Sequence, residues 1–175
     1  MKYANTKVAS KKQEKRIAKE MDARVTIASG ALDFQKADVR NDNYLVEAKT
    51  TEKSYYPLNI STWHKIEEQS LKDGLRIPVM CIDLQDGKHS IAVLHHHDFD
   101  LFLEVFSDRY KFVPTPTLQA KKSIRLRESV VSIILINDLN TPTINYQRIK
   151  FEDRTELIIL DWNDFLILQG VLSNV

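Results

Sequence analysis

Residues 36–49, with the sequence KADVRNDNYLVEAK, decide the fold that we predict for this chain. Apolar and β-branched residues crowd into residues 43–50 between polar neighbours, which is typical of a β-strand. The polar run at residues 40–43 in front of this strand predicts a tight turn. The stretch is therefore expected to form a hairpin.

The two faces of the predicted strand differ in character, because side chains alternate along a strand. Tyr44, Val46 and Ala48 share the face that suits a core. Glu47 and Lys49 lie side by side on the opposite face. This face is therefore the one that can carry chemistry.

The turn sets which residues join that polar face. A two-residue loop at residues 41–42 would place Asp38 opposite Leu45, one diagonal step from Glu47. Two carboxylates and the ammonium of Lys49 would then converge on one patch. Such a patch suits a divalent cation next to a phosphate.

Length and composition leave several protein classes open. The chain has 175 residues and a 43% apolar composition, enough for one domain with a core or one domain with a subdomain. The net charge of +1 does not by itself indicate a nucleic-acid-binding protein, although basic residues outnumber acidic ones across residues 2–24. Cys81 is the only cysteine, which fits a reducing cytoplasm. The sequence shows no signal peptide or membrane-spanning pattern, so we expect a cytoplasmic protein.

A first helix is predicted from Ser10, because Gln13 follows at the spacing of a capping box. It is expected to run to about residue 24, with Ile17 on its apolar stripe. Glu14 falls on the same stripe by the i, i+3 rule. Two interpretations stay open: Glu14 reaches water at the edge of the stripe, or it points into a charged site.

The remaining pattern predicts a core, a linker and a β-rich extension. In residues 1–109 we expect strands at 24–28, 78–84 and 89–94, the last two joined at Asp86-Gly87, and helices at 61–73 and 98–106. Residues 110–120 contain Pro114 and Pro116 and are expected to be a linker. Residues 121–175 are expected to be a C-terminal extension packed on the core or at a dimer interface. Its strands are predicted at 123–127, 130–136, 146–151 and 156–160, with a last helix at 162–168.

The order of the polar residues resembles a known group. Glu14 and Arg16 in a helix, a Ser29-Gly30-Ala31 loop, Asp38, and then Glu47-Ala48-Lys49 before Thr50-Thr51 together resemble the PD-(D/E)xK nuclease superfamily. Within it, the chain is most similar to archaeal-type and phage Holliday-junction resolvases. The resemblance covers roughly residues 11–94, with Ala37 where the namesake proline would stand.

The resemblance implies a fold and a site. The fold would be an α/β restriction-endonuclease-like core, a mixed central β-sheet flanked by helices, and a phage-encoded enzyme of this kind would act in the host cytoplasm. The catalytic residues would be Glu14, Asp38, Glu47 and Lys49. Mg²⁺ or Mn²⁺, which take oxygen ligands, would be held by Asp38, Glu47, the backbone carbonyl of Ala48 and Glu14. Lys49 would position or deprotonate the attacking water.

Candidate DNA contacts surround this set. A basic helix face is usually only solvated, and for the two residues at 65 and 69 that interpretation is as good as a DNA contact. Contacts of this kind would hold phosphates and weaken with salt. The candidates are Lys11, Lys12, Lys15, Arg16, Ser29, Lys36, Arg40, Lys65 and Gln69.

Two other signals are interpreted as structural. The run His95-His96-His97 looks like a metal cluster, but adjacent residues are expected to diverge, so a strand-to-helix junction with Asp98 as N-cap is favoured. Cys81 lies in an apolar strand and is expected to be a small buried hydrophobe.

The predicted site residues suggest three candidate functions, ranked from the most to the least favoured. The first is a metal-dependent, structure-selective DNA endonuclease, a Holliday-junction resolvase that acts as a homodimer on branched or duplex DNA. The second is a restriction- or repair-type nuclease on the same core. The third, from a different class, is a catalytically silent DNA-binding or assembly module.

Overall fold

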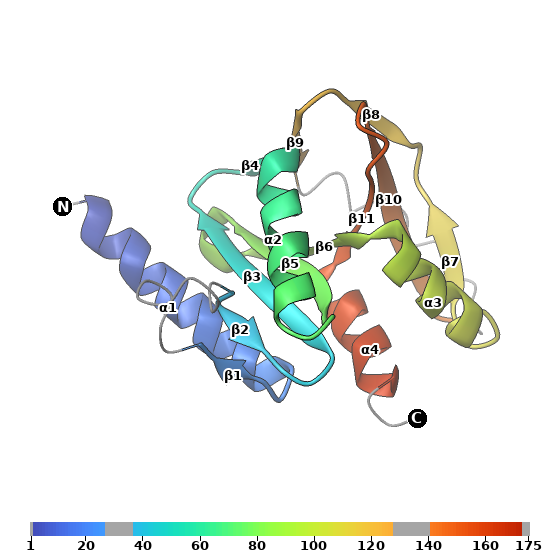
Figure 1. Ribbon diagram of the computed structural model, residues 1–175, viewed down its shortest axis with the longest axis horizontal. Coiled ribbons are helices and arrows are strands. Elements are labelled where there is room, and N and C mark those ends of the chain that lie inside the picture. Colours follow the sequence, from blue (N-terminus) through green and yellow to red (C-terminus); the bar gives the residue numbers. More distant parts are fainter. Residues whose placement is uncertain (1, 27–36, 128–140, 173–175) are drawn as a thin grey trace.

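The computed structural model describes residues 2–26, 37–127 and 141–172. These residues form a mixed α/β structure in which four helices flank a large central sheet (Figure 1). The predicted class, α/β with a mixed central sheet, is confirmed at this level. No helix in these three ranges is long and apolar enough to span a membrane.

The described elements follow in chain order. The helices are α1 (Lys2–Glu20), α2 (Ile60–Lys72), α3 (His96–Phe106) and α4 (Trp162–Leu172). The strands are β1 (Arg24–Val25), β2 (Val39–Arg40), β3 (Tyr44–Thr51), β4 (Tyr55–Asn59), β5 (Ile77–Leu84), β6 (His89–His95), β7 (Lys111–Pro114), β8 (Leu118–Ala120), β9 (Ser123–Arg127), β10 (Thr143–Phe151) and β11 (Glu156–Asp161).

One sheet runs through the molecule in the order β1-β2-β3-β5-β6-β11-β10-β7, with β8 also paired to β10. β3 and β5 are parallel, and the crossover between them contains α2, as parallel neighbours require. β4 and β9 form a separate two-stranded antiparallel sheet, which we call the ribbon. Because β11 pairs with β6, the C-terminal strands continue the same sheet.

The structure differs from the predicted domain division mainly at the segment that was expected to be a linker. Residues 110–120 contain β7 and β8, which both pair with β10. The prediction of a linker rested on Pro114 and Pro116 and is wrong. β7 lies at the edge of the sheet, where a proline without an N–H removes no ladder hydrogen bond.

Two apolar cores lie on opposite faces of the sheet, and β5 supplies both. Val79 and Cys81 pack with residues of α1, α3 and α4. Met80 and Ile82 pack with Trp63 of α2 and with residues of the ribbon. Cys81 is fully buried, as predicted.

Helix α1 starts earlier than predicted. It begins at Lys2, so Ser10 lies inside the helix and is not its N-cap. The preceding residues include Ala4, Lys7 and Ala9, which favour helix and extend it through the expected start. Gln13 therefore does not close a capping box. It points into the protein instead and is only 3% exposed.

The other predicted helix ends agree better with the structure. Asn59 caps α2, and Gly74 follows its C-cap with φ of +88°, a value that glycine adopts without strain. Asp161 accepts a hydrogen bond from the backbone of Asn163 at the start of α4, as expected of a cap. Helix α3 differs, because its N-cap is His95 and not Asp98.

The hairpin between β2 and β3 is real, but its register differs from the prediction. Val39 pairs with Val46, two residues further along β3 than a two-residue loop would allow. The side chain of Asn41 accepts hydrogen bonds from the backbone N–H groups of Asn43 and Tyr44. This side-chain turn widens the loop and so shifts the pairing.

Candidate active site

The predicted catalytic residues come from three elements that meet near the C-terminal half of β3. Glu14 lies on α1, Asp38 lies one residue before β2, and Glu47 and Lys49 lie on β3. In Figure 1 this end of β3 lies between α1 and the ribbon strand β4. The site is thus built from segments separated by up to 35 residues.

Asp38 occupies a different place from the one predicted, and a better one for a shared site. In the observed register Val39 pairs with Val46. One residue further from the turn, Asp38 therefore lies opposite Glu47, and not opposite Leu45 as predicted. Its Oδ2 accepts a hydrogen bond from the N–H of Ala48 at 2.9 Å. Asp38 is therefore held between the two β3 residues of the site.

Lys49 and Glu47 form a close ion pair. Lys49 Nζ lies 2.5 Å from Glu47 Oε1, and the two side chains are 32% and 16% exposed. Burial lowers the pKa of Lys49, but Glu47 and then Asp38 outweigh it, so the pKa is raised above its ordinary value. Lys49 therefore stays a cation at neutral pH.

All three carboxyl groups have raised pKa values. For Asp38 the main cause is burial, which the Ala48 N–H and Lys49 only partly offset. Burial and then Asp38 raise the pKa of Glu47, with a smaller effect from Glu14. Burial and then Asp38 raise the pKa of Glu14. These couplings place the four groups within one electrostatic field.

The donor set fits a hard divalent cation. Burial is the main cause of the three raised pKa values, followed by Asp38 for Glu14 and Glu47, and a bound cation would favour the ionised carboxylates. Their oxygens are not gathered into one coordination sphere, since the only described trio with ligand atoms within 4.8 Å is His95, His96 and His97. Glu47 is turned onto Lys49, and binding a cation would require it to leave that contact.

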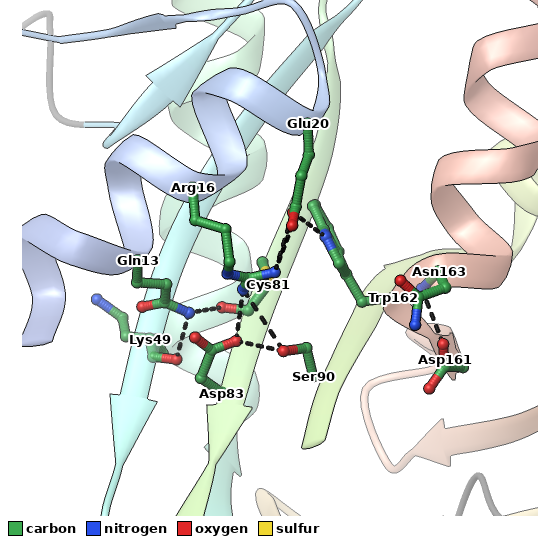
Figure 2. A network of polar contacts seen from close by, with 10 residues as sticks. All are labelled: Gln13, Arg16, Glu20, Lys49, Cys81, Asp83, Ser90, Asp161, Trp162 and Asn163. Atoms are coloured by element: carbon green, nitrogen blue, oxygen red, sulfur yellow. Dashed lines mark hydrogen bonds and ion pairs between the residues drawn. The ribbon is translucent and has the colours of Figure 1, made fainter. Parts of the chain in front are cut away.

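Gln13 was missed as a site residue, and Figure 2 shows its role. Its Nε2 donates to the carbonyl of Lys49 at 2.9 Å and to that of Cys81 at 3.3 Å. It thereby fastens α1 to β3 at the predicted catalytic lysine and fixes the position of the neighbouring Glu14. The sequence does contain a sign of this role. Gln13 lies four residues before Ile17, which places it on the inward-facing stripe of α1.

Arg16 is half-buried and takes part in a network that Figure 2 also shows. Its guanidinium lies 2.8 Å from Asp83 and 2.9 Å from Glu20. Glu20 accepts from the indole N–H of Trp162 at 2.8 Å, and Ser90 donates to Asp83 at 2.6 Å. Arg16 thus ties α1 to β5 and α4, and the structure gives it a packing role in place of the predicted DNA contact.

The other predicted DNA contacts are spread over the surface. The exposed residues of α1 remain available near the site, and Lys11 is close enough to lower the pKa of Glu14. Arg40 is paired with Asp73 at 3.1 Å. In the described structure no hydrogen bond or ion pair joins α2 at positions 65 and 69 to the site. The exposed α1 residues are Lys11, Lys12 and Lys15, and the two α2 residues are Lys65 and Gln69.

Two predicted contacts cannot be placed. Ser29, with the whole Ser29-Gly30-Ala31 loop, and Lys36 lie outside the described residues.

The ribbon adds two tyrosines beside the site. Burial raises the pKa of Tyr56, and Lys49 and Glu47 both act on it, so its ring lies near the ion pair. Tyr55 is on the opposite face of the ribbon, with the cation of Lys53 5.4 Å and that of Arg125 5.3 Å from its ring centroid. Tyr56 therefore borders the acidic residues, and the basic surface around Tyr55 lies on the other face of the ribbon.

The expected divergence of the three adjacent histidines is wrong. One ligand atom from each of His95, His96 and His97 lies within 4.8 Å of the others. The backbone is extended at His95 and helical from His96, and this change of direction brings the rings together. Alternation along a strand was the wrong rule at a strand-to-helix junction.

Comparison with protein-family models, with curated proteins and with solved structures found no match.

Proposed function

We propose that this protein is a metal-dependent DNA endonuclease of the PD-(D/E)xK type that cleaves branched DNA in the manner of a Holliday-junction resolvase. The observation that carries the proposal is the shared field of Glu14, Asp38, Glu47 and Lys49. These groups come from α1, the β2 edge and β3. Residues that only stabilised the fold would pair off their charges, whereas these keep three carboxyls against one ammonium.

The order of elements supports a restriction-endonuclease-like core. A helix with the first acid precedes an antiparallel β1-β2-β3 meander, and a helical crossover leads to β5, parallel to β3. The acidic and basic residues of β3 pair with β5 on one side, and β2 pairs with the two residues just before them, Leu45 and Val46. A rigid strand of this kind holds catalytic groups in fixed geometry.

Each residue has a role in hydrolysis of a phosphodiester. A bound Mg²⁺ or Mn²⁺ would supply Lewis-acid activation of the phosphate and of the attacking water. Asp38, Glu47, Glu14 and the Ala48 carbonyl are the groups that would hold it. Lys49 has a raised pKa, so its role is to orient the water and to offset charge on the phosphate, not to take the proton.

DNA would reach the site over two basic surfaces. One is α1 with Lys11, Lys12 and Lys15, and the other is the ribbon with Lys53 and Arg125 around Tyr55. Lysine and arginine hold phosphates, and an aromatic ring between them stacks on an exposed base. Cutting both strands of a junction symmetrically would need a homodimer.

Cleavage of a synthetic four-way junction in Mg²⁺ tests the proposal. The wild-type protein is expected to give nicked duplexes, and to keep doing so when linear duplex is added as competitor. Asp38→Asn and Lys49→Ala should bind the junction and fail to cut it. Asp42→Asn and Lys88→Ala, which change exposed charges, are the matched controls and should cut normally.

The outcomes separate the alternatives. Equal cutting of linear duplex would favour a restriction- or repair-type nuclease on the same site. Cutting that survives in Asp38→Asn and Lys49→Ala would reject the site. Absence of cutting together with no rise in melting temperature in millimolar Mn²⁺ would favour a silent binding module, because a ligand that binds only the native state raises that temperature.

A further inference from the structure

Histidines gather at the junction of β6 and α3, away from the acidic site. Three of the chain's five histidines are consecutive here: His95 ends β6, and His96 and His97 begin α3. A fourth, His64, lies on α2 and is linked to this place through Glu67. Charge-bearing side chains from both faces of the sheet meet at this edge.

The trio is close enough to share one ligand. The ring centroids of His96 and His97 are 3.8 Å apart, and those of His95 lie 4.7 and 4.9 Å from them. One ligand nitrogen from each ring lies within 4.8 Å of the others. Around a tetrahedral metal with bonds of about 2.0–2.1 Å, nitrogens are about 3.4 Å apart, so small side-chain rotations suffice.

The rings have few competing partners. His96 Nδ1 is buried and has no hydrogen-bond partner in the described structure. His95 Nδ1 accepts a long hydrogen bond of 3.3 Å from the backbone N–H of His97. A buried ring nitrogen without a partner costs free energy that a metal bond would recover. The buried ring nitrogen of His96 therefore favours metal binding by the trio over a role limited to capping helix α3.

A carboxylate lies near the trio, on a different element. Glu67 Oε2 is held 3.0 Å from His64 Nδ1, and His64 Nε2 lies 2.8 Å from Asp153. The oxygens of Glu67 are not among the ligand atoms that lie within 4.8 Å of one another in the trio. Glu67 therefore adds negative charge near the three histidines, and the ligands themselves come from the histidines.

We propose that His95, His96 and His97 bind a borderline divalent transition-metal ion of the zinc class. Imidazole nitrogen suits Zn²⁺, Ni²⁺ and Cu²⁺, whereas the carboxylates near Asp38 suit Mg²⁺ or Mn²⁺. The two sites would thus favour different ions. A metal here would fasten the end of β6 to the first turn of α3 and would act as a structural clamp.

Zn²⁺ titration of protein without added tag histidines tests the clamp. Zn²⁺ at micromolar concentration is expected to raise the melting temperature by several degrees, since the ion binds the folded arrangement better than the unfolded chain. His96→Ala and His97→Gln should each weaken Zn²⁺ binding at least tenfold by calorimetry. His89→Ala, at the other end of β6, is the control and should bind as the wild type does.

His97→Gln is the decisive variant, because His97 is the exposed member of the trio and its replacement leaves the core unchanged. It therefore folds even where His96→Ala does not. Unchanged Zn²⁺ affinity in His97→Gln would overturn the proposal. Equal affinity in urea-unfolded protein would reduce the site to a simple run of imidazoles and would overturn it too. No rise in melting temperature with Zn²⁺ would overturn it as well.

Discussion

Two polar clusters lie within one turn of each other along α1, and they differ in how their charges are satisfied. Around Arg16, each charged group has close partners, from Asp83 and Glu20 to Ser90 and Trp162. Around Glu14, three carboxyls share a single ammonium, and no described hydrogen bond or ion pair holds Glu14 itself. We call these the closed cluster and the open cluster.

We infer that the closed cluster stabilises the fold and that the open cluster is the part that would act on a substrate. A closed network of buried polar groups stabilises one arrangement, because each desolvated group regains its hydrogen bonds. An open cluster of like charges is unfavourable unless a ligand compensates it, and shifted pKa values of this kind gather at functional sites. The closed cluster and Gln13 together keep α1 in the position that the open cluster requires.

Glu14→Gln is expected to have the largest effect on cleavage with little effect on stability. It removes one carboxyl from the open cluster, and the rate of junction cleavage should fall about 100-fold, the size of effect seen when one electrostatic group is removed from an active site. Single-turnover cleavage in Mg²⁺ measures it. Glu104→Gln on α3 is the control, and equal rates in the two variants would place Glu14 outside the site.

Asp83→Asn breaks the closed cluster and should mainly reduce stability. Asp83 is nearly buried, with a side chain 7% exposed, and Arg16 would be left without its main partner. We expect a loss of about 2 kcal/mol in the free energy of unfolding, a fall of about 4–8 °C in melting temperature for a domain of this size. Asp86→Asn, an exposed carboxylate on the neighbouring turn, should change neither. A loss below about 0.5 kcal/mol would show that the network is not structural.

The ribbon surface allows a test of how DNA reaches the open cluster. Replacing Lys53 and Arg125 together with serine should weaken junction binding about tenfold at 0.1 M salt and reduce the salt slope by about two. Fluorescence anisotropy measures both. Lys88→Ser with Arg109→Ser changes the net charge equally at exposed positions elsewhere. An equal loss of affinity in that control would mean that only net charge matters.

The pH dependence of stability should show the smallest effect. Because the pKa of Asp38 is raised in the folded protein, the unfolded chain binds fewer protons between the ordinary pKa of about 3.8 and the raised one, and stability falls as pH rises through that window. Asp38→Asn removes this penalty and keeps an acceptor for Ala48. It should therefore melt higher than the wild type at pH 8, with a smaller gap at pH 4.5. A gap that widens toward acid would have the wrong sign for a raised pKa.

Sequence reasoning found the residues of the open cluster but not their exact placement. Glu47 and Lys49 followed from strand alternation alone. The position of Asp38 did not, because the side chain of Asn41 widens the turn, and a single asparagine bonding to its own backbone overrides the loop-length rule. The shift set Asp38 opposite Glu47 rather than diagonal to it.

The closed cluster and the histidine trio could not be predicted from spacing. Arg16 was predicted to contact DNA because it lies in a cluster of basic residues on the first helix, yet its partner Asp83 is 67 residues away on β5. Contacts between distant segments depend on sheet order, which the strand pattern leaves undetermined. The prolines at 114 and 116 led to the prediction of a linker, whereas Pro114 lies in an edge strand, which tolerates it.

Junction cleavage by Asp38→Asn and by Asp83→Asn, measured side by side at a temperature where both are folded, tests the central claim most directly. The open cluster should be required for chemistry, and the closed one only for stability. Asp38→Asn is expected to retain binding and lose cleavage by at least about 100-fold. Asp83→Asn is expected to cut within about threefold of the wild type despite its lower melting temperature. Cleavage by Asp38→Asn at the wild-type rate would contradict the account.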